Sequence, residues 1–202
     1  MRKIAVMYGG SYQHHYMFKE SKFSTYFDTL IPLRQFADTD LSTFDVLIIP
    51  SWSHMKVLEQ NAEKIRAFAD SGKIVVTFGP QHFDWIPNTT WENRPTNFWW
   101  WLEPGADSGL VLTGPEHELF QKHLTLADAT WHQHGVYRPS ESSEVLVSQK
   151  DGAAVLFIDK TSSNGTWINM TLDPDFHVGM HFMPAAESFL TGFLPWLQNG
   201  NV

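Results

Sequence analysis

The chain has 202 residues, of which 43% are hydrophobic and 18% are charged, and such values are typical of a globular protein. Its formal net charge of -8 argues against nucleic acid and anionic membranes as partners, because both bind basic protein surfaces. The chain has no cysteine, which excludes disulfides, thiol nucleophiles and thiolate metal ligands. It has no stretch approaching the roughly 18 apolar residues that span a bilayer. We therefore expect a soluble, cytoplasmic protein with a single domain over residues 1–202.

Short apolar runs in the first half predict buried parallel strands. The first covers residues 4–8 and ends in a Gly9-Gly10-Ser11 turn. Residues 18–30 are interpreted as a helix, followed by a short strand over residues 30–34. Residues 45–50 repeat the pattern of a buried strand.

The clearest element is a helix over residues 56–71, in which Leu58, Ala62, Ile65 and Ala69 form one apolar stripe. Gly72 is the expected C-terminal residue that ends it. A strand over residues 73–78 follows at once, so this region predicts a right-handed parallel crossover unit.

Residues 80–130 show no comparable periodicity and are rich in tryptophan, including Trp99-Trp100-Trp101. A loop region of this length is usually functional or covers a site. Three interpretations of the tryptophans stay open, in this order: a second core, an interface between subunits, and a platform for sugar rings.

Beyond this region the pattern changes to antiparallel strands. Residues 145–148 and 153–158 flank a turn at residues 149–152, which predicts a hairpin. Residues 165–171 supply a further strand, and Pro184 opens a closing helix.

Four segments together resemble the class I glutamine amidotransferase-like superfamily, and within it the trehalose-utilisation (ThuA-like) branch. They are residues 44–50, 65–78, 165–171 and 172–177. The resemblance implies an α/β fold with a flavodoxin-like parallel sheet flanked by helices, to which the antiparallel hairpin region is appended. It also implies a site at the carboxyl ends of the parallel strands. The tryptophan content and the habit of this superfamily together predict a homodimer.

The glutaminases of this superfamily carry an elbow cysteine where the strand over residues 73–78 ends. Gly79 stands at that place, and Phe78, Pro80 and Gln81 beside it are equally inert. The chain therefore lacks the nucleophile for thioester chemistry, which excludes glutaminase activity. His177 matches the region where those enzymes keep their triad histidine.

His177 with Asp173 and Asp175 is the first candidate group for chemistry. A carboxylate that orients an imidazole makes a general base, so we assign His177 and Asp175 as catalytic and Asp173 as substrate-binding. The alternative is that Asp173-Pro174-Asp175 builds a turn, and the two interpretations are compatible.

The loops at the carboxyl ends of the strands supply further candidates for substrate binding, because parallel strands end at one edge of a sheet. These are Gly10, His54, Gly79, Gln81 and His82, and His14-His15 lie close enough to join them.

Trp131, His132 and His134 form the last candidate group for substrate binding. In an extended segment both histidines point to the same face, as paired metal ligands would. We favour a solvated strand face beside a buried tryptophan over a metal site. No cofactor is therefore expected, and a divalent metal is kept as an alternative.

These observations predict a protein that binds or processes a small polar, carbohydrate-like molecule. Two alternatives stay open: a catalytically silent domain that binds a ligand or a partner, and a metal-dependent hydrolase that uses the His and Asp cluster.

Overall fold

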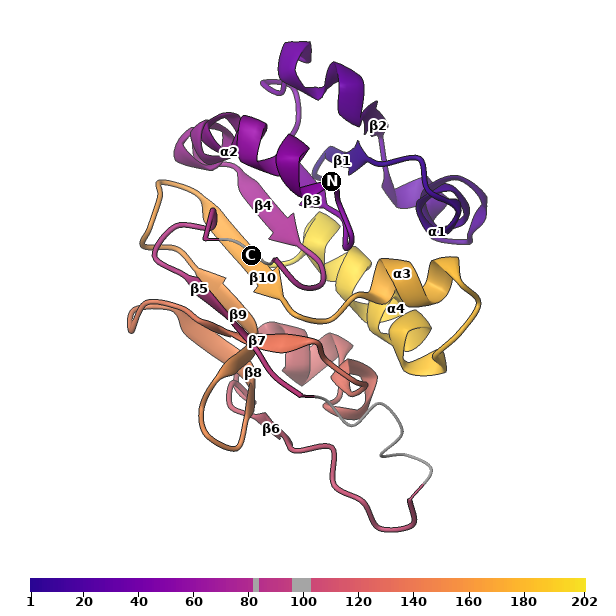
Figure 1. The fold of residues 1–202 in the computed structure, drawn as a ribbon, viewed down its shortest axis with the longest axis vertical. Helices are drawn as coiled ribbons and strands as arrows, with labels where there is room; N and C mark the ends of the chain where they lie inside the picture. The colour runs from indigo at the N-terminus through magenta and orange to yellow at the C-terminus, as the bar shows by residue number, and fades with distance from the viewer. Residues whose placement is uncertain (82–83, 96–102) are drawn as a thin grey trace.

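The computed structural model describes residues 1–81, 84–95 and 103–202. Within these residues ten strands form one mixed sheet, with the order β2-β1-β3-β4-β10-β9-β7-β5 and with β8 pairing to both β9 and β6 (Figure 1). The expected α/β fold, a parallel sheet flanked by helices with an appended antiparallel region, is confirmed.

The parallel half consists of five strands in the order β2-β1-β3-β4-β10, which is the flavodoxin-like order. Its strands β3 and β4 are buried along their whole length, as a sheet covered on both faces requires. The bounds of the five strands are β1 (Ile4–Tyr8), β2 (Thr29–Pro32), β3 (Val46–Ile49), β4 (Ile74–Thr77) and β10 (Thr166–Met170).

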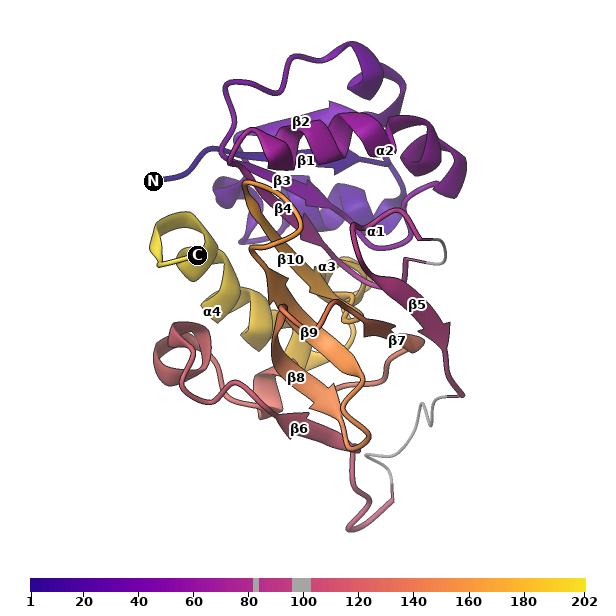
Figure 2. The same ribbon diagram turned by 90° about the vertical axis from the view of Figure 1, so that its left-hand side faces the viewer.

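Two long helices cover opposite faces of this half (Figures 1 and 2). The buried side chains of α2 (Met55–Asp70) pack with Leu47 and Val75, whereas those of α4 (Pro184–Asn199) pack with Ile48 and Val76. Because neighbouring residues of a strand point to opposite faces, these contacts place one helix on each side. No helix among the described residues is long and apolar enough to cross a membrane.

The antiparallel half begins at β10, which pairs parallel with β4 and antiparallel with β9. The predicted hairpin is present as β8 and β9, and the turn is closed by the Gln149 N–H donating to the Ala153 carbonyl. The strands of this half are β5 (Thr90–Asn93), β6 (Leu110–Leu112), β7 (Gly135–Arg138), β8 (Glu144–Gln149) and β9 (Ala154–Asp159).

One prediction for the short helical segments differs from the structure. The helix predicted over residues 18–30 is wrong, because Ser21 interrupts it: its hydroxyl donates to the Met17 carbonyl and accepts from the Phe23 N–H. The segments are α1 (Tyr12–His15), η1 (Tyr16–Glu20), η2 (Ser24–Tyr26), η3 (Leu33–Asp38), η5 (Leu119–His123), η6 (Ala127–Ala129) and α3 (Pro174–Gly179).

The tryptophans that the structure describes are mostly core residues, and Trp85, Trp131, Trp167 and Trp196 are fully buried. Of the tryptophans in residues 80–130 that the structure describes, Trp85 is buried as a core residue would be, and Trp91 is partly buried. Trp99, Trp100 and Trp101 lie outside the described residues.

Candidate functional site

The first turn of α3, directly after β10, supplies the central groups of the site. Pro174 is the first residue of α3 and Asp173 is its N-cap, so the expected Asp-Pro-Asp turn serves as the start of a helix. Asp173 and His177 lie four residues apart and therefore share one face of this helix.

His177 is paired with Asp173. Its Nε2 lies 3.2 Å from Asp173 Oδ1, and both side chains are 1% exposed. The same oxygen accepts a hydrogen bond of 3.1 Å from the indole N–H of Trp131. His134 Nε2 lies 4.0 Å from the other oxygen, Oδ2. The carboxylate that orients His177 is thus Asp173, and not Asp175 as the sequence suggested.

Five aromatic rings form a closed circuit beside this carboxylate. In order around the circuit, the rings are those of Trp52, His134, His132, His177 and Phe176, and the last lies next to the first. The distances between the centroids of successive rings are 5.3, 5.7, 5.0, 5.4 and 6.0 Å. Trp52 is 46% exposed and is the part of the circuit that solvent reaches most easily. The histidines predicted from the segment 131–134 are therefore joined to His177, although His134 precedes β7 and does not lie in a strand.

The charges of this group follow from its burial. Burial alone would raise the pKa of Asp173, but the adjacent His177 and the Trp131 indole outweigh it and hold that pKa below its ordinary value. Burial, together with the neighbouring His177, lowers the pKa of His132 to about 4. At neutral pH the site thus combines an ionised carboxylate with a neutral imidazole at His132.

Asp175 belongs to a second buried group next to the first. Its Oδ2 accepts a hydrogen bond of 3.0 Å from the Ser51 N–H and lies 3.7 Å from His14 Nε2. Burial raises the pKa of Asp175. His14 Nε2 donates to the Ser51 carbonyl at 2.9 Å, so this nitrogen is not available to take a proton from the Ser51 hydroxyl. These three residues therefore do not form a Ser-His-Asp triad.

Gly79 separates the two groups. Its φ of 72° is in the left-handed region, and a Cβ there would lie 2.7 Å from Ser51 Cβ and 3.3 Å from Asp173 Cβ. Its N–H donates to the Leu172 carbonyl and its carbonyl accepts from the Tyr137 hydroxyl. The backbone of Gly79 therefore lies between the two groups of the site. The space that the side chain of an elbow nucleophile would need is filled by Ser51 and Asp173.

The other residues that were predicted to bind substrate contribute less to the site. Gly10, with φ of 76°, makes the turn after β1. His54 is the exposed N-cap of α2, and no hydrogen bond or ion pair joins it to the described residues of the cluster. Gln81 is buried and bonds the Phe78 carbonyl and the Trp85 indole, which is a structural role. His82 lies outside the described residues.

Among the residues that the structure describes, no group of three or more His, Asp or Glu side chains is arranged to hold a metal ion.

Sequence reasoning missed Ser51, Trp52 and Phe176 as members of the site. Ser51 and Trp52 follow β3, and this position in the expected sheet was the one signal that pointed to them. Trp52 is held with φ of 55°, a conformation that is uncommon for a bulky residue.

No family model matches the chain, and no curated protein matches it in sequence. Solved structures that are similar in fold include the following two. The cytoplasmic protein STM1381 from Salmonella typhimurium LT2 has a TM-score of 0.57 at 12% identity, with 98% of this chain and 100% of that chain covered. The exo-beta-1,4-mannosidase Op5Man5 from Opitutaceae bacterium strain TAV5 has a TM-score of 0.54 at 7% identity, with 98% of this chain covered. This chain spans 36% of the mannosidase. At these identities the similarity shows a shared fold, and function has to be argued from the site.

Proposed function

We propose that this chain is a relative of the class I glutamine amidotransferase-like superfamily, close to its trehalose-utilisation branch, that lacks glutaminase chemistry. It binds or processes a small polar, carbohydrate-like molecule at the carboxyl ends of the parallel strands. His177 is the acid/base, Asp173 orients it, and Asp175 supplies a carboxyl group with a raised pKa nearby.

The observation that carries this proposal is a concentration of buried polar atoms without hydrogen-bond partners in the described structure. Such atoms are rare in folded proteins, and a group of them calls for an explanation. Here they gather in the segments that follow β1, β3 and β10, including α1 and α3: Ser11 Oγ, His14 Nδ1, Ser51 Oγ, Thr171 Oγ1, Asp173 Oδ2, Asp175 Oδ1 and His177 Nδ1. A ligand with several hydroxyl groups both donates and accepts hydrogen bonds, so it can satisfy a mixed set of this kind.

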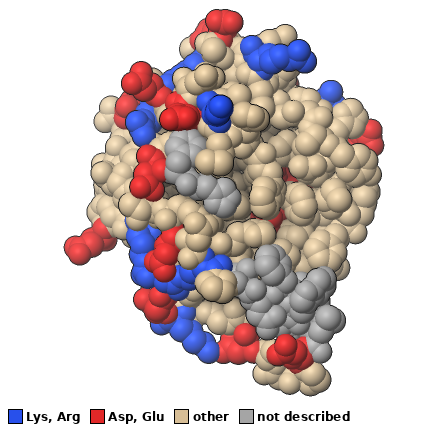
Figure 3. Space-filling model, in the orientation of Figure 1, with Lys and Arg blue, Asp and Glu red and all other residues tan. Residues whose placement is uncertain are grey.

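The surroundings of these atoms favour an uncharged ligand. Figure 3 shows charged side chains along the left margin and at the upper and lower ends of this face, whereas the area over α3 and the loop after β3 has few of them. Trp52 offers an exposed indole next to His134 and Phe176, and indoles stack on the apolar faces of sugar rings.

The two carboxyl groups suit acid/base work. The pKa of Asp173 is lowered and that of Asp175 is raised, so Asp175 holds its proton to higher pH than Asp173 does. Titratable pairs whose environments separate their pKa values are typical of acid/base sites.

A silent binding domain is the second candidate. It is favoured by the burial of His177, whose side chain is 1% exposed and has little access to a substrate. The homodimer, the cytoplasmic location and the absence of a cofactor belong to the proposal in either form.

A thermal-shift series with neutral mono- and disaccharides and polyols tests binding. A ligand at 100 times its Kd stabilises by about 2.7 kcal/mol, which raises the melting midpoint by roughly 5–10 °C for a chain of this size. We expect this rise for the natural protein and for His117→Gln, a control at a half-buried imidazole outside the site, and its loss in Asp173→Asn.

Equal shifts in all three proteins, or no shift with any compound, would contradict the proposed site. Where a compound binds, analysis of the recovered compound by NMR separates the two candidates. Chemical change that is lost in His177→Gln supports acid/base catalysis, and unchanged compound supports a silent binding domain.

A further inference from the structure

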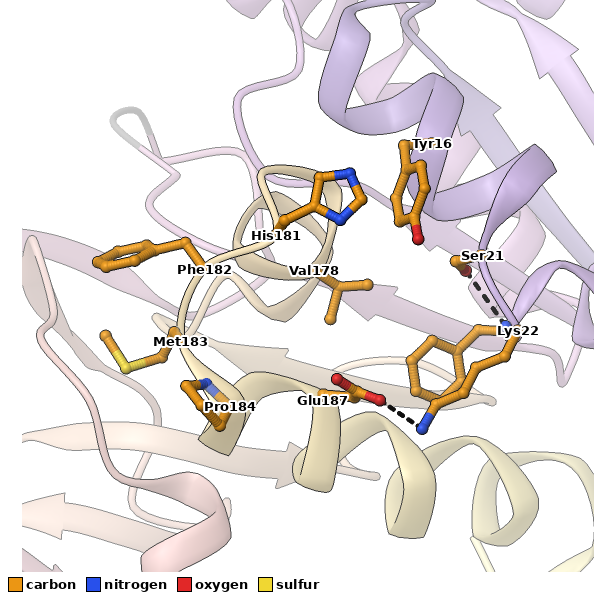
Figure 4. Close-up of a pocket in the computed structure, with 10 residues that line it drawn as sticks. Tyr16, Ser21, Lys22, Val178, His181, Phe182, Met183, Pro184 and Glu187 are labelled. Carbon is orange, nitrogen blue, oxygen red and sulfur yellow. Dashed lines mark hydrogen bonds and ion pairs between the residues drawn. The ribbon is translucent and has the colours of Figure 1, made fainter.

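A pocket lies between η1 and the connection from α3 to α4 (Figure 4). It is enclosed by η1 and the residues after it, by the connection from α3 to α4, and by the first turn of α4. Its volume is about 330 Å³, which is enough for a small organic molecule. None of the groups that carry the proposed function lines it.

The pocket presents one positive and one negative group side by side. Lys22 Nζ lies 2.5 Å from Glu187 Oε1, and the two side chains are 59% and 55% exposed. Figure 4 shows them together at one side of the pocket, facing the Tyr16 hydroxyl and the His181 ring on the opposite side. The pair comes from two segments 165 positions apart in the chain, so the fold itself brings the charges to this place.

Apart from Ser21, the rest of the lining is apolar. Phe23, Val178, Met183 and Pro184 form this part, and Phe182 stands at its margin with 45% of its surface exposed. A ligand that fills the pocket therefore needs a compact charged end with both signs and an apolar body.

The backbone around the pocket is held in uncommon conformations. His181 and Met183 have φ values of 55° and 71°, each of which costs of order 1 kcal/mol or more for a residue other than glycine. Strain of this kind clusters at ligand-binding segments. On the opposite wall, Tyr16 begins a π-helical turn, η1, and its ring lies 4.0 Å from that of His181. Such turns are frequent at functional sites.

The start of α4 adds a preference for an anionic group. Met183 is the N-cap of this helix of 16 residues and has no side-chain oxygen to accept from the N–H groups of the first turn. The positive end of the helix therefore faces the pocket without a side-chain cap, next to Lys22.

We propose that this pocket binds a zwitterionic α-amino acid with an apolar side chain. The ligand carboxylate pairs with Lys22 at the start of α4, and its ammonium pairs with Glu187. The side chain lies against Phe23, Val178 and Met183. A surface ion pair contributes only about 0–1 kcal/mol, so opening the Lys22–Glu187 contact to admit a ligand with matching charges costs little.

The pocket also touches the proposed acid/base site. Phe182 stands at its margin, and the ring of Phe182 lies 5.2 Å from that of His177. The binding proposal does not depend on the function of that site, because none of its polar contacts involves Asp173 or His177.

Isothermal titration calorimetry of the whole chain with L-leucine, L-methionine and L-phenylalanine tests the proposal. We expect saturable binding of at least one, with affinity reduced at least tenfold in Lys22→Met and in Glu187→Gln. The N-acetylated amino acid lacks the ammonium group, and the amino acid amide lacks the carboxylate. Each of these capped compounds should therefore bind at least tenfold more weakly than the free amino acid.

Lys122→Met is the matched control, because Lys122 forms a similarly exposed pair with Glu118 at 3.0 Å on another surface. Its affinity for the amino acid should equal that of the natural protein. Melting midpoints within a few degrees of the natural protein show that the Lys22 and Glu187 variants remain folded. No saturable binding of any of the three amino acids would overturn the proposal. Binding that is insensitive to Lys22→Met and Glu187→Gln would also overturn it, as would equal affinity for the capped forms.

Discussion

Gly79 packs directly against Ser51, and a Cβ on the glycine would lie only 2.7 Å from the Cβ of Ser51. The end of β4 therefore has no space for the side chain that an elbow nucleophile needs. The departure from the glutaminase pattern extends beyond one residue, because Ser51 and Asp173 occupy the surrounding volume. Placing a cysteine at this position would therefore introduce backbone and packing strain.

We expect Gly79→Ala to be clearly more destabilising than Gly72→Ala. Both glycines have positive φ, 72° and 84°, so both substitutions introduce about 1–2 kcal/mol of backbone strain. A Cβ at Gly72 meets nothing within 4 Å, whereas one at Gly79 is crowded, and crowding adds about 1–3 kcal/mol. Urea unfolding of the two variants measures the difference. Equal losses of stability would show that the packing at Gly79 is not tight.

Asp173→Asn should remove part of the acid sensitivity of the fold. The folded-state pKa of Asp173 lies below its unfolded value of about 3.9, so its contribution is present above that pH and is lost as pH falls towards the folded pKa. The free energy of unfolding of the natural protein should therefore fall more steeply below about pH 5 than that of the variant. At pH 7 the variant should be less stable by about 3 kcal/mol, because an ionic partner of His177 is lost. Parallel pH curves for the two proteins would contradict this assignment.

Asp175→Asn should behave in the opposite way. The folded-state pKa of Asp175 is raised by burial, so its contribution is complete below the unfolded pKa of about 3.9 and declines as pH rises towards the folded pKa. Asparagine imitates the neutral acid and has no such loss, so the variant gains stability relative to the natural protein as pH rises from about 4 to 7. Urea unfolding across this range measures the trend, and a relative loss with rising pH would show that Asp175 is ionised in the folded state.

His132 should stay neutral well below physiological pH. Its pKa is lowered to about 4 by burial and by the positive charge that His177 can carry, and the negative charge of Asp173 opposes this. His177→Gln should therefore raise the pKa of His132, whereas Asp173→Asn should lower it further. Imidazole ¹⁵N shifts followed from pH 7 to pH 3 report both changes. Shifts of the same sign in the two variants would contradict the cluster geometry.

The parallel half could be predicted from sequence because its signals are local. The runs at residues 4–8, 45–50 and 73–78 are apolar on both faces, which a strand between two helix layers requires. The stripe of α2 likewise specifies its own buried face. By contrast, β5 is only half-buried and its four residues carry no alternating pattern, so nothing in the sequence indicated a strand there.

The site could be predicted only in part, because its geometry depends on long-range packing. Asp173 and His177 are one helical turn apart, and their contact depends only on whether Pro174 opens a helix or closes a turn. His132 and His134 reach His177 through the path of the chain before β7, which has no periodic pattern. Trp52 enters the site because of its left-handed backbone conformation, which no sequence rule predicts for tryptophan.

The most direct test of the central claim is to follow the imidazole and indole resonances during titration with the neutral sugars and polyols. The account predicts that one of these compounds shifts the signals of His134, His177 and Trp52 together and with saturation. The indole of Trp196, a buried residue of α4 that belongs to neither group of the site, should remain unchanged. If no compound shifts the three signals, or if a compound that binds shifts only signals outside this cluster, then the carboxyl end of the sheet is not the ligand site.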